Sequence, residues 1–198
     1  MPFYPSTYEM KEQVSDYMKM EEGEHKVRIL MPPTIGYETW NEENKPLRFH
    51  TFGEAVNSHS RDGKIKEFHA FIVWNYKLEM IQLLNITQRG IQEWIYNQTL
   101  DEDWADPTSY DIVIKRTGKG INDTTYSMVA KMPKPMDKSI SEALKVVKID
   151  WDEYFTGGHP IIRNKDGNNT TDDSSKLADE AFEALAKEET VKSVNVPF

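Results

Sequence analysis

Residues 68–76 form the strongest strand pattern in the sequence and constrain the fold more than any other feature. Every second residue from Phe68 to Tyr76 is apolar, and Phe71 and Val73 between them are apolar as well. Side chains alternate across an extended chain, so this strand is apolar on both faces. We therefore expect several of its aromatic rings to lie in the core.

Other extended runs surround this strand. Apolar and charged residues alternate from Val27 to Ile29 before Pro32-Pro33, and further runs cover 35–40 and 47–52, which together are typical of a meander. Residues 80–86 are close enough to form a hairpin with 68–76. A glycine-bearing turn at 117–123 predicts a second hairpin between 110–116 and 124–132. The intervening residues 53–66 lack apolar periodicity and predict a surface loop carrying Arg61, Lys64 and Lys66.

Before residue 164, helices are expected at four places. Residues 8–22 predict a short helix, and Thr87 is an N-cap candidate for a helix that ends near Thr99. Ser139-Ile140-Ser141-Glu142 has the capping-box pattern for a helix ending near Val147, and residues 151–155 predict one further turn. The order of strands, one helix and a final hairpin is typical of an OB fold, a five-stranded barrel with a helix between its third and fourth strands. We predict a mainly β protein of this type, with extra N-terminal strands and peripheral helices.

Charge divides the chain into three parts. Residues 1–24 carry two lysines and six acids, for a net charge of −4, and residues 166–198 carry three lysines and eight acids, for −5. The remaining residues balance, although the whole chain has a net charge of −9. We predict an acidic N-terminal arm (1–23), a nucleic-acid-binding domain (24–163) and an acidic C-terminal segment (164–198). That segment reads as a polar linker, a short amphipathic helix and the apolar tip Val196, Pro197 and Phe198.

The composition argues against several classes of function. The chain has no cysteine, its five histidines lie in separate contexts, and no nucleophile or phosphate-loop motif occurs, so we expect no catalytic residue, metal or cofactor. No apolar run is long enough to span a membrane, and residues 1–5 lack the pattern of a signal peptide. These patterns predict a soluble, cytoplasmic protein that is not an enzyme.

Aromatic and basic residues alternate on the predicted strands in the way that a groove for single-stranded nucleic acid requires. Bases stack on aromatic rings while cations follow the phosphates. The predicted groove consists of Trp40, Arg48, Phe49, Trp74, Tyr76, Arg116, Lys119 and Tyr126. The alternative reading, that most of these rings are core, stays open for each ring.

Four segments make the prediction more specific. They are Phe71-Ile72-Val73-Trp74-Asn75-Tyr76, Ile81 to Gln88, Asp103-Trp104-Ala105-Asp106-Pro107 and Tyr110-Asp111-Ile112. Over residues 24–155 the chain resembles a family of small tailed-phage proteins taken to be single-stranded DNA-binding proteins with an OB fold. The acidic segment ending in Phe198 is similar in design to the partner-binding tails of bacterial and phage single-stranded DNA-binding proteins, although residues 191–198 contain no acid.

The resemblance implies a phage protein that coats single-stranded DNA without sequence preference during replication or recombination, in the host cytoplasm. Val196, Pro197 and Phe198 would bind replication or recombination proteins. Two other hypotheses are a protein–protein adaptor and an accessory subunit of a nuclease. The sequence does not distinguish DNA from RNA as the ligand, and it leaves the oligomeric state open.

Overall fold

The computed structural model describes residues 14–120 and 123–163. The chain divides into two units, residues 1–163 and 164–198, and the second unit lies outside the described residues. The predicted linker, amphipathic helix and Val196–Phe198 tip therefore have no structural account here. The described part is mainly β with a few helices, as the sequence predicts.

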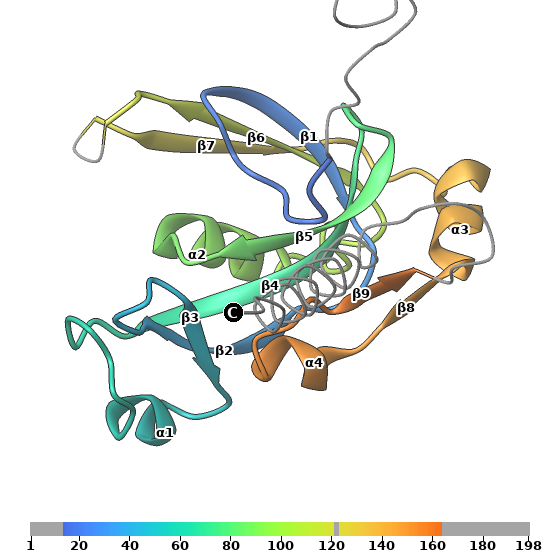
Figure 1. Ribbon diagram of the computed structural model, residues 1–198. Coiled ribbons are helices and arrows are strands. Elements are labelled where there is room, and N and C mark those ends of the chain that lie inside the picture. The colour runs from blue at the N-terminus through green and yellow to red at the C-terminus, as the bar shows by residue number, and fades with distance from the viewer. Residues whose placement is uncertain (1–13, 121–122, 164–198) are drawn as a thin grey trace, which may run out of the picture. The chain divides into compact units, whose positions relative to one another are not determined.

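An antiparallel sheet of seven strands is built around β4 (Lys66–Asn75), the strand that the sequence predicts most strongly. Along one edge β4 pairs with β5 (Met80–Ile86), and along the other it pairs with β2 (Thr34–Trp40) and then β1 (Gly23–Ile29) (Figure 1). β2 also pairs with β3 (Pro46–Phe49), β1 with β6 (Asp111–Thr117), and β6 with β7 (Thr125–Ala130).

The predicted meander of the first three strands is confirmed for β2 and β3, which form an antiparallel pair, and is wrong for β1. β1 and β2 do not pair with each other; both run antiparallel to β4, with Ile29 opposite Val73 and Thr34 opposite Ala70. They act as one long strand that bends at Pro32-Pro33. Proline fixes its own backbone near a φ of −65° and keeps the preceding residue extended, so the chain bends and continues.

The predicted closed barrel is not observed, because the sheet stays open in the part of the chain that the structure describes. Its pairings run β5-β4-β1-β6-β7, and closure would require β5 to pair with β7. The free edge of β5 is occupied instead by residues 16–18, where Met18 N donates to Leu83 O and Leu83 N donates to Asp16 O, both at 2.8 Å. The helix α2 (Arg89–Gln98) contacts both β5 and β7 (Figure 1).

Two apolar clusters cover the two faces of β4, which explains its apolar pattern. The first contains Phe71 and Val73 of β4 together with Ile91 and Ile95 of α2. The second contains the opposite face of β4 and lies under the C-terminal elements of the domain. These elements are α3 (Lys138–Lys145), β8 (Val147–Ile149), α4 (Trp151–Phe155) and β9 (Ile161–Arg163) (Figure 1).

Helix starts depart from the predicted caps. The N-cap of α2 is Gln88 and that of α3 is Asp137, and neither side chain makes a capping hydrogen bond. In the loop predicted for 53–66, residues Phe52–Val56 form α1, held by a capping box between Thr51 and Glu54. Glu54 follows Thr51 by three residues, which is the spacing of a capping box, so the sequence itself contains the signal for this helix. The predicted helix at 8–22 is absent from its described part, residues 14–22, where the chain runs beside β5.

Candidate nucleic-acid interface

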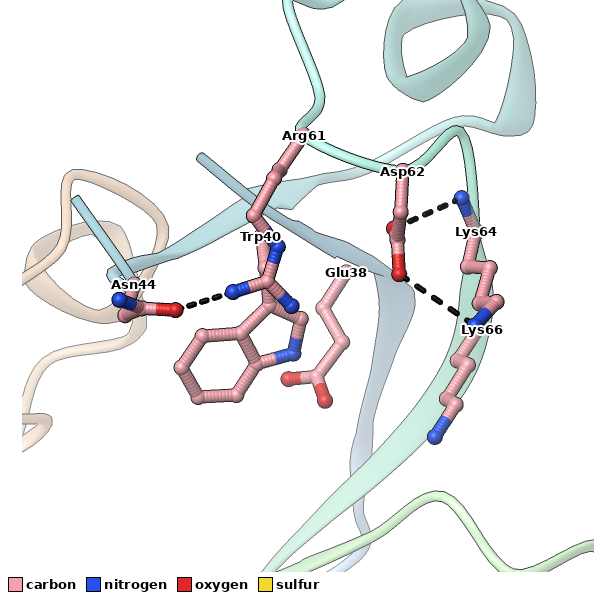
Figure 2. A pocket seen from close by; sticks show the side chains of 7 residues that line it. All are labelled: Glu38, Trp40, Asn44, Arg61, Asp62, Lys64 and Lys66. Atoms are coloured by element: carbon pink, nitrogen blue, oxygen red, sulfur yellow. Dashed lines mark hydrogen bonds and ion pairs between the residues drawn. The ribbon is translucent and has the colours of Figure 1, made fainter. Parts of the chain in front are cut away.

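An open pocket of about 390 Å³ lies where β2 ends and β4 begins. Its lining residues are Glu38, Trp40, Asn44, Arg61, Asp62, Lys64 and Lys66. In Figure 2, Asn44 and Arg61 lie beside the indole of Trp40, and Asp62, Lys64 and Lys66 lie on the other side of Glu38. Trp40 is 40% exposed, a large exposed fraction for a tryptophan at the end of a strand. The pocket therefore combines an accessible aromatic ring with three basic side chains.

Two loops hold this pocket in place. Asn44 has a φ of 59° in the turn between β2 and β3, a left-handed conformation that asparagine tolerates better than most residues. Its side-chain oxygen accepts a hydrogen bond from the Arg61 guanidinium (Figure 2). The backbone N–H of Arg61 donates to the carbonyl oxygen of Trp40 at 2.8 Å. These contacts fix the 57–65 loop over the end of β2.

The basic side chains of the pocket differ in how far they are neutralised. Lys64 lies 3.5 Å from Asp62, and its backbone N–H also donates to this carboxylate, which lowers the pKa of Asp62. The buried Glu38 carboxylate accepts from Asn85 Nδ2 at 3.0 Å. Within residues 14–120 and 123–163, neither Arg61 nor Lys66 has a carboxylate within 4.0 Å. Lys64 is therefore the most fully neutralised of the three basic side chains.

The two predicted site residues on β3 lie near this pocket but are engaged by the protein itself. Arg48 is 9% exposed, stacks 3.9 Å over the ring of Tyr154 and donates to the Tyr154 carbonyl at 3.3 Å. Burial in this packing raises the pKa of Tyr154. Phe49 is half-buried opposite Tyr37. Arg48 thus anchors α4 to the sheet, and its contact with DNA stays a prediction without an exposed guanidinium to support it.

Trp74 and Tyr76 lie at the other end of β4. Trp74 is 7% exposed and belongs to the second apolar cluster, so its ring offers no open face for a base. The half-buried Tyr76 hydroxyl donates to Asp111 at 2.8 Å, while the Lys26 ammonium lies 4.0 Å from the centre of the Tyr76 ring. The pKa of Tyr76 is raised by burial and by this hydrogen bond to Asp111.

The remaining three predicted residues gather at the β6–β7 hairpin. Arg116 and Tyr126 are directly opposite each other across the two strands. Arg116 donates to the Met20 carbonyl at 2.8 Å, and Tyr126 packs partly against the first apolar cluster. Lys119, in the turn, is 87% exposed with only a 3.8 Å ion pair to Glu22. The predicted site therefore falls into three separate groups.

The distance between these groups follows from the strands. Trp40 ends β2 near Lys66, whereas Trp74 and Tyr76 lie at the opposite end of β4. At about 3.3 Å per residue, the nine steps from Lys66 to Asn75 span up to about 30 Å. The group at the β6–β7 hairpin is separated from β4 in the sheet by β1.

Comparisons of the chain with protein-family models, curated proteins and solved structures found no match. Among the described residues, no group of three or more histidine and acidic side chains is placed to hold a metal ion. No helix in the described part is long and apolar enough to cross a membrane.

Two groups of charged residues are not predicted as parts of a site by the sequence. The first group consists of Arg61, Lys64 and Lys66, which the sequence places in a loop outside the predicted site. They follow Trp40 by at least 21 residues, and only the fold brings them close to it. Their common signal was the density of basic residues in a segment without apolar periodicity. The second group is a buried charge cluster around Asp111, whose members come from β1, β6 and the 133–137 segment.

Proposed function

We propose that this protein binds single-stranded DNA without sequence preference. The observation that carries the proposal is the exposed indole of Trp40 beside Arg61, Lys64 and Lys66. An exposed ring can stack on any base, and neighbouring cations can follow the backbone phosphates. A strand bound in this way is recognised by its charge and its bases' π-faces, with no reading of base edges.

The strand connections support an OB-type arrangement with an open seam. If the bent β1–β2 strand is taken as the first strand, then β4, β5, β6 and β7 follow as second to fifth, and α2 lies between the third and fourth. OB folds are described as partly open barrels that bind oligonucleotides with the face of strands 2 and 3 and with the loops joining strands 1–2 and 4–5. In this assignment those loops are residues 41–65 and 118–124.

This assignment places Arg61 and Lys64 in one binding loop and Lys119 in the other, with Trp40 and Lys66 at the ends of the first loop. The outward side chains of β4 and β5, by contrast, are covered by α3, α4 and β9. We therefore propose that a bound strand uses the two loops, and that Trp74 supports the fold beneath the covering layer.

The acidic segment 164–198 supports a second element of the proposal. Residues 166–198 carry a net charge of −5, which would compete with DNA for the basic loops, and Val196, Pro197 and Phe198 would bind replication or recombination proteins. This element rests on sequence alone.

Titration with oligo-dT, followed by tryptophan fluorescence, tests the proposed function. We expect quenching of emission and an affinity that falls steeply with salt, because binding releases counterions from the strand. Replacing Trp40 with Ala should remove most of the quenching and weaken binding by about 1–3 kcal/mol, the usual contribution of one stacked base. Tyr96→Ala is the matched control, since Tyr96 is 60% exposed on α2 and outside the pocket.

Two outcomes would contradict the proposal. One is unchanged emission with no salt-sensitive binding, which would favour the protein–protein adaptor. The other is equal loss of affinity in Trp40→Ala and Tyr96→Ala, which would remove the pocket from the interface. Thermal melts of both variants check that each is folded.

A further inference from the structure

A second pocket, of about 420 Å³, lies at the far end of β4 from Trp40. Its lining residues are Arg28, Thr108, Ser109, Pro133, Lys134, Pro135 and Met136. Two of these lining residues, Arg28 and Lys134, are cationic, and three are proline or methionine. Cations beside apolar walls attract an anion more strongly than the same cations in open water, because the local dielectric constant is lower.

Arg28 is the most informative residue of this pocket, because it is only 1% exposed. Its Nε donates to Asp111 at 2.7 Å, and its Nη1 donates to the carbonyls of Thr108 at 3.2 Å and Lys134 at 3.3 Å. Its Nη2 is buried and donates to no group in the described part of the chain. A buried charged donor without an acceptor is costly, so this nitrogen calls for a further oxygen ligand.

The charges around Arg28 leave an excess of positive charge. The Asp111 side chain is 2% exposed. Its carboxylate forms ion pairs with Arg28 at 2.7 Å, with the Lys26 ammonium at 3.0 Å and with the Lys134 ammonium at 3.5 Å. Asp137 is the other acid in contact, 3.4 Å from Lys134 and largely exposed. Three cations thus face two carboxylates, an excess of one positive charge. The group that would complete this cluster is an anion.

The two side-chain hydroxyls of the pocket already donate within the protein. The hydroxyls of Thr108 and Ser109 both donate to Asp106 at 2.7 Å, one to its carboxylate and the other to its carbonyl. Among the lining side chains, Arg28 Nη2 has no acceptor in the described residues, and the Lys134 ammonium has only long ion pairs there, of 3.4 and 3.5 Å. A phosphate group offers three strong acceptor oxygens and a charge of about −1.5 to −2, and arginine pairs with it readily.

We propose that this pocket binds a phosphate group, held by Arg28 and Lys134. The site is separate from the Trp40 pocket, and inorganic phosphate alone tests it, so it does not depend on the proposed function. The phosphate could belong to a nucleic-acid strand or be free in solution. Both sources present the same oxygens to the two donors.

The test measures inorganic phosphate binding to the full chain by ³¹P NMR and by thermal melts, at constant ionic strength set with sodium chloride. We expect saturable binding and a melting temperature that rises with phosphate, because a ligand of the folded state stabilises it. Lys134→Ala should weaken binding about tenfold or more, through loss of a charge-assisted hydrogen bond. Lys138→Ala is the control, because Lys138 is 90% exposed on α3, pairs with Glu142 and does not line the pocket.

Arg28→Lys gives a second test, since it keeps the charge but removes the guanidinium fork. We expect it to weaken phosphate binding as well; if it fails to fold, Lys134→Ala and its control still decide. The proposal is overturned if phosphate acts no differently from chloride, if acetate binds equally well, or if Lys134→Ala behaves like Lys138→Ala.

A competition experiment separates the two sources of phosphate. Oligo-dT that displaces inorganic phosphate, and binds more weakly to Lys134→Ala, identifies the strand backbone as the source. Oligo-dT that binds without displacing inorganic phosphate identifies a free phosphate compound as the source. Either result keeps the site and assigns its ligand.

Discussion

Trp40 and Trp74 show how much the role of one residue type depends on its position. Both follow alternating strand patterns, yet Trp40 is 40% exposed and Trp74 is 7% exposed. Trp40 ends its strand at an open turn, whereas Trp74 faces Ile81 and other apolar residues of the second cluster. The first ring is free to stack on a base, and the second contributes to the stability of the domain.

Asp111 is the residue on which acid stability should depend. Burial alone would raise the pKa of Asp111, but hydrogen bonds from Lys26, Tyr76 and Arg28 outweigh it and lower the pKa to about 2. The ordinary value is about 3.9, so the folded state holds the charged form more tightly. This stabilisation is fully present above about pH 4 and is lost as the pH falls towards 2.

Asp111→Asn should remove that pH dependence and lower the free energy of unfolding at pH 7 by about 3–5 kcal/mol, because Arg28 keeps a buried charge without its carboxylate. Urea unfolding of both proteins between pH 2 and pH 7 measures the effect. The difference should shrink towards pH 2, where about half of the wild-type Asp111 carboxylate is protonated. An equal difference at every pH would contradict the assignment.

At the scale of elements, the β2–β3 hairpin depends on one close approach. A Cβ built on Gly36 of β2 would lie 2.6 Å from the Phe49 carbonyl oxygen and 2.8 Å from the Phe68 ring. Because β3 carries Arg48, which contacts Tyr154 of α4, moving β3 also disturbs the covering layer. The hairpin and α4 are thus coupled through a glycine.

Gly36→Ala should therefore destabilise the domain by about 1–3 kcal/mol, the typical cost of overpacking. Gly53→Ala is the matched control: a Cβ there meets nothing within 4 Å, and alanine is the better helix former in α1. Denaturant unfolding of the two variants measures both effects. Similar stabilities for the two variants would show that β3 moves away from Gly36 at little cost.

At the scale of the whole molecule, charge is unevenly distributed between the acidic segment and the rest of the chain. Removing residues 164–198 takes away four lysines and eight acids, which is a net charge of −4. We expect the shortened protein to bind oligo-dT more tightly, most clearly at low salt, because competition with the basic loops is lost. Binding titrations at two salt concentrations measure this.

A thermal melt of the shortened protein gives the complementary result. A marked fall in melting temperature with unchanged DNA affinity would mean that residues 164–198 stabilise the folded domain and do not compete for its ligand. Deleting only Pro197 and Phe198 removes no acid, so we expect that change to leave DNA affinity unaltered.

The alternating pattern of the sequence determined the central strand at 68–76, its hairpin with 80–86 and the final hairpin, since residue periodicity depends only on local backbone geometry. It did not determine the partner of the first strand. The meander prediction holds for β2 and β3 but fails for β1, because β1 and β2 form one strand that bends at two prolines. The open seam was decided by residues 16–18, which occupy the edge of β5.

The candidate site divides in the same way. The sequence predicts Trp40 as one ring of an aromatic and basic surface, because the capacity for stacking and the charge of a side chain follow from residue type alone; this assignment stays a prediction. Only the tertiary structure decided that Trp74 is covered, that Arg48 is held by Tyr154, and that Arg61 and Lys66 join Trp40. Periodicity assigns a side chain to a face, but what covers that face depends on segments distant in sequence, as α4 covers Phe68.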